Sequence, residues 1–105
     1  MEREVICNLT EENFDHKTGR GTMIVDFWAP WCGPCRSQSG ILDGMVQRGE
    51  LPDGVSIGKV NVDEQPELAM RYDVSAIPTL LVFKEGRQVE RLEGVQSAER
   101  LVASL

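Results

Sequence analysis

The sequence MIVDFWAPWCGPC occupies residues 23–35 and places two cysteines directly after an apolar run. The run Met23–Trp28 is typical of a buried strand and is interrupted by one carboxylate, Asp26. A helix that begins at Cys32 would bring Cys35 within the roughly 4.4–6.8 Å between Cα atoms that a disulfide tolerates. A strand that leads into a helix opening at a cysteine is a place where a thiol becomes reactive. The stretch therefore predicts a reversible redox pair.

The bulk composition limits the size and partners of the protein. A chain of 105 residues with 41% hydrophobic residues can build one core, so we expect a single domain over residues 1–105. The formal net charge of −6, with no basic cluster to offset it, argues against a nucleic acid or an anionic membrane as partner. No apolar run in the sequence is long enough to span a bilayer.

The cysteine content and the N-terminus indicate the compartment. Met1–Glu4 is charged and no apolar segment typical of a signal peptide follows it, although a mature secreted protein would look the same. Three cysteines, an odd number, disfavour a scaffold held together by disulfides. We therefore expect a cytoplasmic protein, in a reducing compartment where a closely spaced cysteine pair is more often catalytic or metal-binding than structural.

Strand and helix patterns alternate along the chain and end in a hairpin. The expected strands are Val5–Leu9, the run around Val25, Val55–Val62, Thr79–Phe83 and Gln88–Leu92. The expected helices are one capped by Thr10, one from about Cys32 to Gln47, one over Gln65–Tyr72 and one that is capped by Ser97 and runs to Leu105. This order predicts the α/β class, with a central mixed sheet of about five strands and about four helices on its two faces.

Three motifs in a fixed order resemble the thioredoxin family over nearly the whole chain. They are Trp31–Cys35 after a strand that carries Asp26, Lys59–Asp63, and Ala76–Leu80 before a hairpin. A lone Cys-x-x-Cys is common, but the ordered set is specific. The resemblance implies a thioredoxin-like three-layer sandwich and the activity of a protein-disulfide reductase.

The residue types between and around the cysteines suit thiol–disulfide exchange. The N-terminus of a helix stabilises an anion by roughly 0.3–1 kcal/mol, or up to about 2 in partly buried sites, which would lower the pKa of the Cys32 thiol by roughly one unit. Cys35, one helical turn further on, should point inward and resolve the mixed disulfide. Gly33 allows a substrate backbone to approach, and Pro34 has no cost in the first turn.

Asp26 and Lys59 are the expected proton-handling residues. A carboxylate buried among apolar neighbours should have a raised pKa. The resemblance places Asp26 behind Cys35 as proton acceptor or donor and makes Lys59 its tuning partner. The alternatives are that Asp26 faces solvent at an edge and that Lys59 is a solvated surface lysine.

The resemblance also implies a substrate-binding rim around Cys32. Ile77-Pro78 is similar to the cis-proline loop of the family, whose backbone would bind an extended substrate segment as an added strand. Trp31, Ala76 and Gly94 would complete a flat apolar rim, together with Gly33 and Pro34 between the cysteines. Trp28 and Phe83 are expected in the core instead.

Cys7 and His16 are further candidates for a functional role. Cys7 is expected to be a small buried hydrophobe in the first strand. Cys7, His16 and the pair could in principle ligate zinc, but Cys7 and His16 should lie at opposite ends of a strand–helix unit, so we expect no metal. His16 is expected to be exposed.

The helix after Cys35 departs from the family pattern. Gly40 stands where a proline is usual, and Gln38 stands where an apolar residue would pack. Because interior glycines destabilise helices, this helix is predicted to be looser and straighter than is typical. The segment Val95–Ser97 also differs from the common pattern, which affects the far side of the rim.

The leading functional hypothesis is a general protein-disulfide reductase, with disulfide-containing proteins as substrates. No Gly-x-Gly-x-x-Gly nucleotide fingerprint is present, so we expect no cofactor beyond the cysteine pair and a separate electron donor of the thioredoxin-reductase type. We expect a monomer. The alternatives are an oxidase or isomerase of the same fold, a binding module whose redox activity is incidental, and a zinc-bound structural domain.

Overall fold

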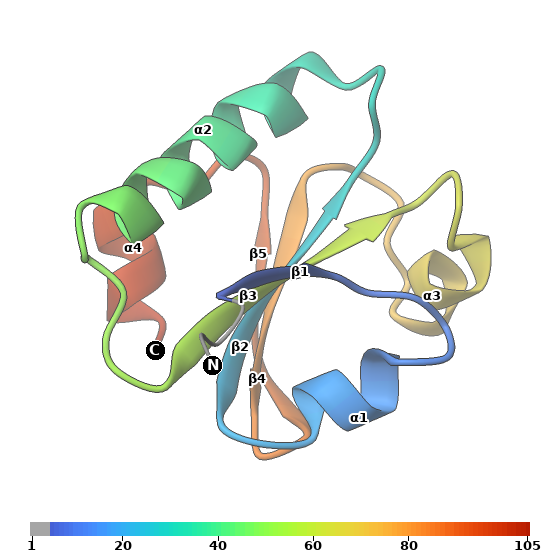
Figure 1. Cartoon of the computed structure of the whole chain (residues 1–105). Coiled ribbons are helices and arrows are strands. Elements are labelled where there is room, and N and C mark those ends of the chain that lie inside the picture. The colour runs from blue at the N-terminus through green and yellow to red at the C-terminus, as the bar shows by residue number, and fades with distance from the viewer. Residues whose placement is uncertain (1–4) are drawn as a thin grey trace.

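The computed structural model describes residues 5–105, and expectations about residues 1–4 lie outside this range. The described part of the chain contains five strands and four helices, in the predicted order (Figure 1). They are β1 (Ile6–Asn8), α1 (Phe14–Thr18), β2 (Thr22–Trp28), α2 (Gly33–Gln47), β3 (Val55–Asn61), α3 (Pro66–Arg71), β4 (Thr79–Lys84), β5 (Arg87–Glu93) and α4 (Ala98–Ala103).

The strands form one mixed sheet in the order β1-β3-β2-β4-β5. β1 and β2 both run parallel to β3, whereas β4 is antiparallel to β2 and β5. β2 therefore lies in the middle of the sheet, with neighbours on both sides. This position explains why its residues 23–27 are all buried.

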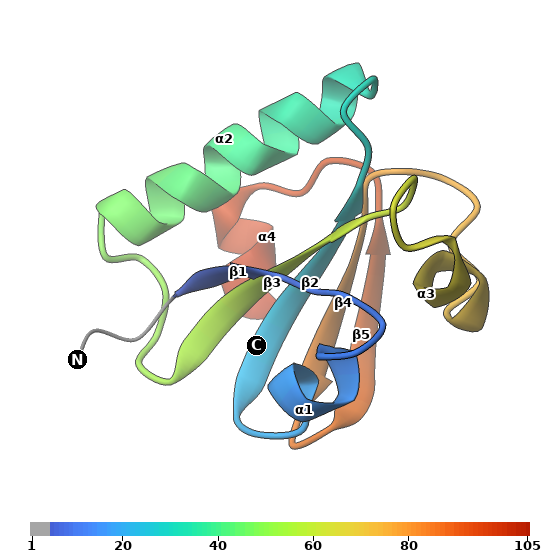
Figure 2. The same cartoon turned by 45° about the vertical axis from the view of Figure 1, so that its right-hand side comes forward.

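Helices cover both faces of the sheet, α2 and α4 on one and α1 and α3 on the other (Figures 1 and 2). Because side chains alternate along a strand, β2 divides between two cores. Met23, Val25 and Phe27 pack in the cluster that includes residues of α1 and α3. Ile24 packs with Leu42 of α2 in the other cluster. Asp26 has the parity of Ile24 and therefore lies on the face covered by α2.

Helix α2 is continuous across Gly40, and Figure 2 shows no break at its midpoint. A side chain at Gly40 would meet nothing within 4 Å, so no tertiary contact demands a glycine there. Within residues 5–105, none of the helices has the length and apolar character needed to cross a membrane.

Two helix boundaries differ by two or more residues from those predicted. α1 begins at Phe14 rather than directly after Thr10. The side chains of Thr10 and Asn13 instead exchange hydrogen bonds with each other's backbone N–H, at 3.2 and 2.7 Å, and hold residues 11–13 in a turn. At the other end of the chain Ser97 caps α4 as predicted, by accepting from the Arg100 N–H at 3.1 Å, but α4 ends at Ala103 rather than Leu105.

Candidate active site

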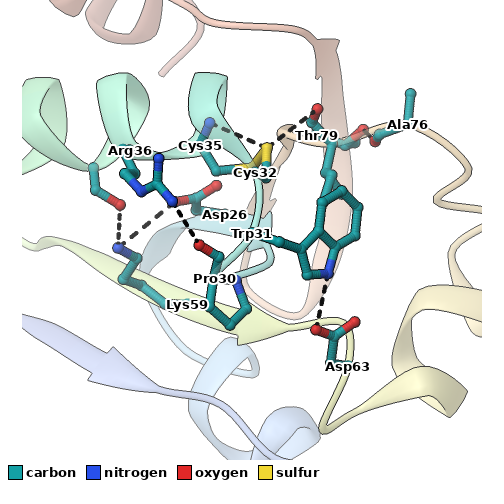
Figure 3. The surroundings of a disulfide bond; sticks show 12 residues. Asp26, Pro30, Trp31, Cys32, Cys35, Arg36, Lys59, Asp63, Ala76 and Thr79 are labelled. Carbon is teal, nitrogen blue, oxygen red and sulfur yellow. Dashed lines mark hydrogen bonds and ion pairs between the residues drawn. A yellow bond between two sulfur atoms is a disulfide. The ribbon is translucent and has the colours of Figure 1, made fainter.

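The two cysteines form a disulfide at the start of α2 (Figure 3). Cys32 is the N-cap residue, in an extended conformation, and its Sγ accepts the backbone N–H of Cys35 at 3.2 Å. The Cα atoms of the pair are 5.3 Å apart, inside the range that the spacing predicted. Cys32 is 5% exposed and Cys35 is 1% exposed. The helix terminus therefore directs an N–H group at the outer sulfur, as anion stabilisation requires.

The first turn of α2 is electrostatically favourable to a thiolate. It contains no acidic residue. Arg36, at its end, donates through Nη2 to the carbonyl of Pro30 at 3.2 Å and ties this turn to the loop that precedes it. A cationic side chain and an unopposed helix N-terminus both favour negative charge on sulfur.

Asp26 is fully buried on the α2 side of the sheet. Among the described residues, neither of its carboxylate oxygens has a hydrogen-bond partner. Burial raises the pKa of Asp26 from 3.8 to about 6, while the ammonium of Lys59 lowers it to a smaller extent. The solvent-facing alternative for Asp26 is wrong, because α2 covers this face of the central strand.

Lys59 is the residue paired with Asp26 across the β2–β3 ladder. Its Nζ lies 4.0 Å from Oδ2 of Asp26, and its side chain is 17% exposed, so it is not a solvated surface lysine. Nζ also donates to Oγ of Ser39 at 2.5 Å and lies 5.2 Å from the ring centroid of Trp28. The ammonium is thus shared between a carboxylate, a hydroxyl and an aromatic face.

Ser39 was not among the site residues expected from the sequence. It lies four residues after Cys35 on α2, which places both on one face of the helix. The four-residue spacing could have indicated that Ser39 lies on the same face of α2 as Cys35. The sequence does not show that Lys59 on β3 reaches this face of the helix. Trp28 also differs from expectation, because it is only partly buried and packs against the cysteine pair as well as beneath Lys59.

Part of the expected rim, the Ile77-Pro78 loop, lies beside the outer sulfur. Sγ of Cys32 lies 3.8 Å from the carbonyl oxygen of Ile77, and the Ile77-Pro78 peptide bond is cis. The backbone N–H of Gly94 donates to the carbonyl of Pro78 at 2.9 Å. Ala76 and Gly94 are exposed. The Ile77-Pro78 loop therefore lies beside Cys32 and is joined on its other side to Gly94.

Trp31 is the aromatic residue of this rim, and 67% of it is exposed to solvent. Its Nε1 donates to Oδ2 of Asp63 at 3.0 Å, which fixes the indole beside the cysteines (Figure 3). Gly33 and Pro34 are also exposed, and a side chain at Gly33 would meet nothing within 4 Å. The surface next to Cys32 is therefore open to an incoming polypeptide.

Gln38 is completely buried on α2, at the position where the sequence departs from the apolar residue of the family pattern. Its Nε2 donates to the carbonyl of Gln96 at 3.1 Å, and its Oε1 accepts the backbone N–H of Gln96 at 2.7 Å. Both polar ends of the side chain are thereby satisfied, which removes the penalty of burying a carboxamide.

Cys7 and His16 lie apart from the pair. Cys7 is buried in β1, as predicted, and His16 is exposed. Both line one hollow, together with residues of β2 and β3 such as Met23 and Val55. Within residues 5–105, no group of three or more histidine, cysteine, aspartate or glutamate side chains is arranged to hold a metal ion.

The fold and the disulfide define the class of the protein. A cysteine pair at the N-terminus of the helix that follows the central strand of a mixed sheet is the arrangement of a thiol–disulfide oxidoreductase. The family model described as Thioredoxin matches residues 5–105, and the chain belongs to the thioredoxin family.

Similar proteins agree with this assignment. The chain is 46% identical over 93 residues to a thioredoxin of Chlamydia pneumoniae, covering 89% of this chain and 88% of that protein. It is 41% identical over 100 residues to a thioredoxin of Staphylococcus epidermidis, covering 95% and 94%. A mutant thioredoxin from Halobacterium salinarum superposes with a TM-score of 0.84 at 27% identity, over 98% of this chain and 91% of that one. The thioredoxin of Malassezia sympodialis superposes with a TM-score of 0.81 at 29% identity, over 99% of this chain and 91% of that one.

The predictions of fold, family and activity are confirmed. The protein is a thiol–disulfide oxidoreductase that reduces protein disulfides through the Cys32–Cys35 pair.

Proposed function

We propose that Cys32 is the attacking thiol of the reductase and that Cys35 resolves the mixed disulfide. The Cys32 thiolate attacks one sulfur of a substrate disulfide, forms a mixed disulfide and releases the first substrate thiolate. Cys35, as thiolate, then attacks Sγ of Cys32, which forms the Cys32–Cys35 disulfide and releases the second substrate thiolate. Two electrons pass from the protein to the substrate.

The capping hydrogen bond is the observation that carries this division of roles. Sγ of Cys32 accepts the N–H of Cys35 and sits at the positive end of α2. Charge on this sulfur is therefore stabilised before any substrate arrives, as expected for the thiol that must be ionised. Cys35 is more deeply buried, which suits a thiol that meets only the mixed disulfide.

Asp26 is proposed to take the proton from Cys35 when Cys35 attacks. A carboxyl group with a pKa of about 6 is mostly ionised at neutral pH yet basic enough to accept a proton. Lys59 is proposed to tune this basicity, because its ammonium lowers the pKa of Asp26. A hollow lined by Trp28, Cys35 and Ser39 opens beside α2 and supports a route for the proton to solvent.

Substrate binding is proposed to use the rim beside Cys32. Its members are Trp31, Gly33, Pro34, Ala76, Ile77, Pro78 and Gly94. The exposed indole and the backbone of Ile77 would contact an extended segment that flanks the substrate disulfide.

The wider setting is proposed from the family and the composition. Disulfide-containing proteins are the substrates, and a reductase of the thioredoxin-reductase type restores the dithiol. The protein acts as a monomer in the cytoplasm, as one domain over residues 1–105, without a bound cofactor. Reduction of the purified protein by such a reductase, followed through NADPH oxidation, tests the electron supply.

Reduction of insulin disulfides, with dithiothreitol as electron donor, tests the roles of the two thiols. Both Cys32→Ser and Cys35→Ser should lose turnover. When each variant is first reduced, freed of dithiothreitol and then mixed with insulin, only Cys35→Ser should accumulate a covalent adduct, through Cys32. Cys7→Ser is the matched control and should retain activity. An adduct trapped by Cys32→Ser, or full turnover by either variant of the pair, would contradict the assignment.

A further inference from the structure

Gln38 connects α2 to the segment Gly94–Gln96, which follows β5. The two residues joined, Gln38 and Gln96, are 58 positions apart in the sequence. Both hydrogen bonds go to the backbone of Gln96, one to its N–H and one to its carbonyl. The contact therefore holds the path of the chain at residue 96, whatever side chain that residue carries.

The segment Gly94–Gln96 is fixed on its other side by the cis-proline loop. The Gly94 N–H donates to the Pro78 carbonyl at 2.9 Å. The Gln96 side chain closes the segment by donating to the carbonyls of Glu93 and Gly94 at 3.0 and 3.2 Å. Val95, between the two anchors, is 43% exposed. The anchored segment thus presents one apolar side chain to solvent beside the rim.

The Gln38–Gln96 and Gly94–Pro78 hydrogen bonds join α2, the segment Gly94–Gln96 and the cis-proline loop. Gln38 is one turn after Cys35 on the same helix, and Pro78 follows Ile77, whose carbonyl lies 3.8 Å from Sγ of Cys32. A loop that is ordered before binding loses less conformational entropy when a partner binds. An apolar residue at position 38 would leave the N–H and carbonyl of Gln96 without this partner and the segment held on one side only.

We propose that Gln38 is a positioning residue that holds Gly94–Gln96 in place as the far side of the substrate-binding rim. Its ligand is an extended segment of a protein disulfide substrate, so this inference rests on the function proposed above. Gln38 itself touches no substrate. It affects recognition of polypeptides and leaves the exchange chemistry of the cysteine pair unchanged.

Kinetics with two substrates test this role. Gln38→Met keeps the volume of the side chain and removes both hydrogen bonds. We expect the KM for insulin to rise about fivefold or more, with kcat and the rate with the small disulfide 5,5′-dithiobis(2-nitrobenzoic acid) unchanged. Gln47→Met, at an exposed position of the same helix, is the matched control and should leave all three values unchanged. An unchanged KM in Gln38→Met, or an equal loss with both substrates, would overturn the proposal.

Hydrogen exchange of the Gln96 amide provides a second readout, and its measurement in the wild type alone already tests the proposal. In the wild type this amide should be protected about tenfold or more over an unstructured peptide, and Gln38→Met should remove the protection. An unprotected Gln96 amide in the wild type would overturn the proposal even if the variant failed to fold. Failure of wild-type protein to reduce insulin would instead overturn the proposed function, and this inference with it.

Discussion

Replacing Asp26 by asparagine removes a carboxylate that the fold buries without a hydrogen-bond partner among the described residues. The native protein raises the pKa of this group from 3.8 to about 6, chiefly by burial. The folded state therefore binds this proton more tightly than the unfolded state does. The contribution of Asp26 to the free energy of unfolding consequently falls as pH rises from about 4 to about 6. At about 1.36 kcal/mol per pKa unit, the ionised group destabilises the fold by about 3 kcal/mol at neutral pH.

Asparagine resembles the protonated acid in size and charge, so Asp26→Asn should recover most of this energy. We expect the oxidised variant to be more stable than the wild type by up to about 3 kcal/mol at pH 7.5 and equally stable at pH 4. The full gain of about 3 kcal/mol corresponds to a rise in Tm of about 10 °C or more at pH 7.5. Urea unfolding at the two pH values measures both differences.

Asp43→Asn is the control for this experiment, because Asp43 is an exposed carboxylate on α2. Its stability should stay within about 0.5 kcal/mol of the wild type at both pH values. An Asp26→Asn protein that is no more stable than the wild type at pH 7.5, or that gains as much stability at pH 4, would show that the ionised carboxylate does not destabilise the fold.

Three further substitutions test other parts of the account. Gly40→Ala should stabilise α2 by about 1 kcal/mol in urea unfolding, because the added methyl group meets nothing within 4 Å; a loss of stability would show that the glycine is required. Lys59→Gln should raise the pKa of Asp26 above about 6, because it removes the charge that lowers it, and a carboxyl titration by NMR that moves downward would contradict this. Gly58→Ala should destabilise the protein by about 1–3 kcal/mol, since its Cβ would overlap Leu9 Cδ1; unchanged urea unfolding would show that this side chain yields without cost.

The order of elements could be predicted from the sequence because it depends on local patterns. The apolar run in β2 and the cap at Ser97 each act within a few residues. The burial of Asp26 could also be predicted, since an apolar strand in the middle of a sheet is covered on both faces. The start of α1 was misplaced because the Thr10–Asn13 turn competes with the helix for the same hydrogen-bonding groups.

The unpredicted features of the site are contacts between distant segments. Nothing near Gln38 in the sequence indicates that the Gln96 backbone will meet it. Likewise, Ser39 becomes a partner of Lys59 only when α2 packs across β3. The cysteine pair and the rim were found because their motifs are contiguous, whereas these polar partners depend on the packing of α2 against β3 and the segment after β5.

Alkylation of the fully reduced protein across a pH series tests the central claim most directly. The claim is that the N-terminus of α2 makes the Cys32 thiol acidic while Cys35 remains the poorer outside nucleophile. We predict that Cys32 reacts first with iodoacetamide and that its pKa lies below the value of about 8.5 that is usual for cysteine. A Cys32 that titrates near that usual value, or reacts no faster than Cys35, would contradict the account.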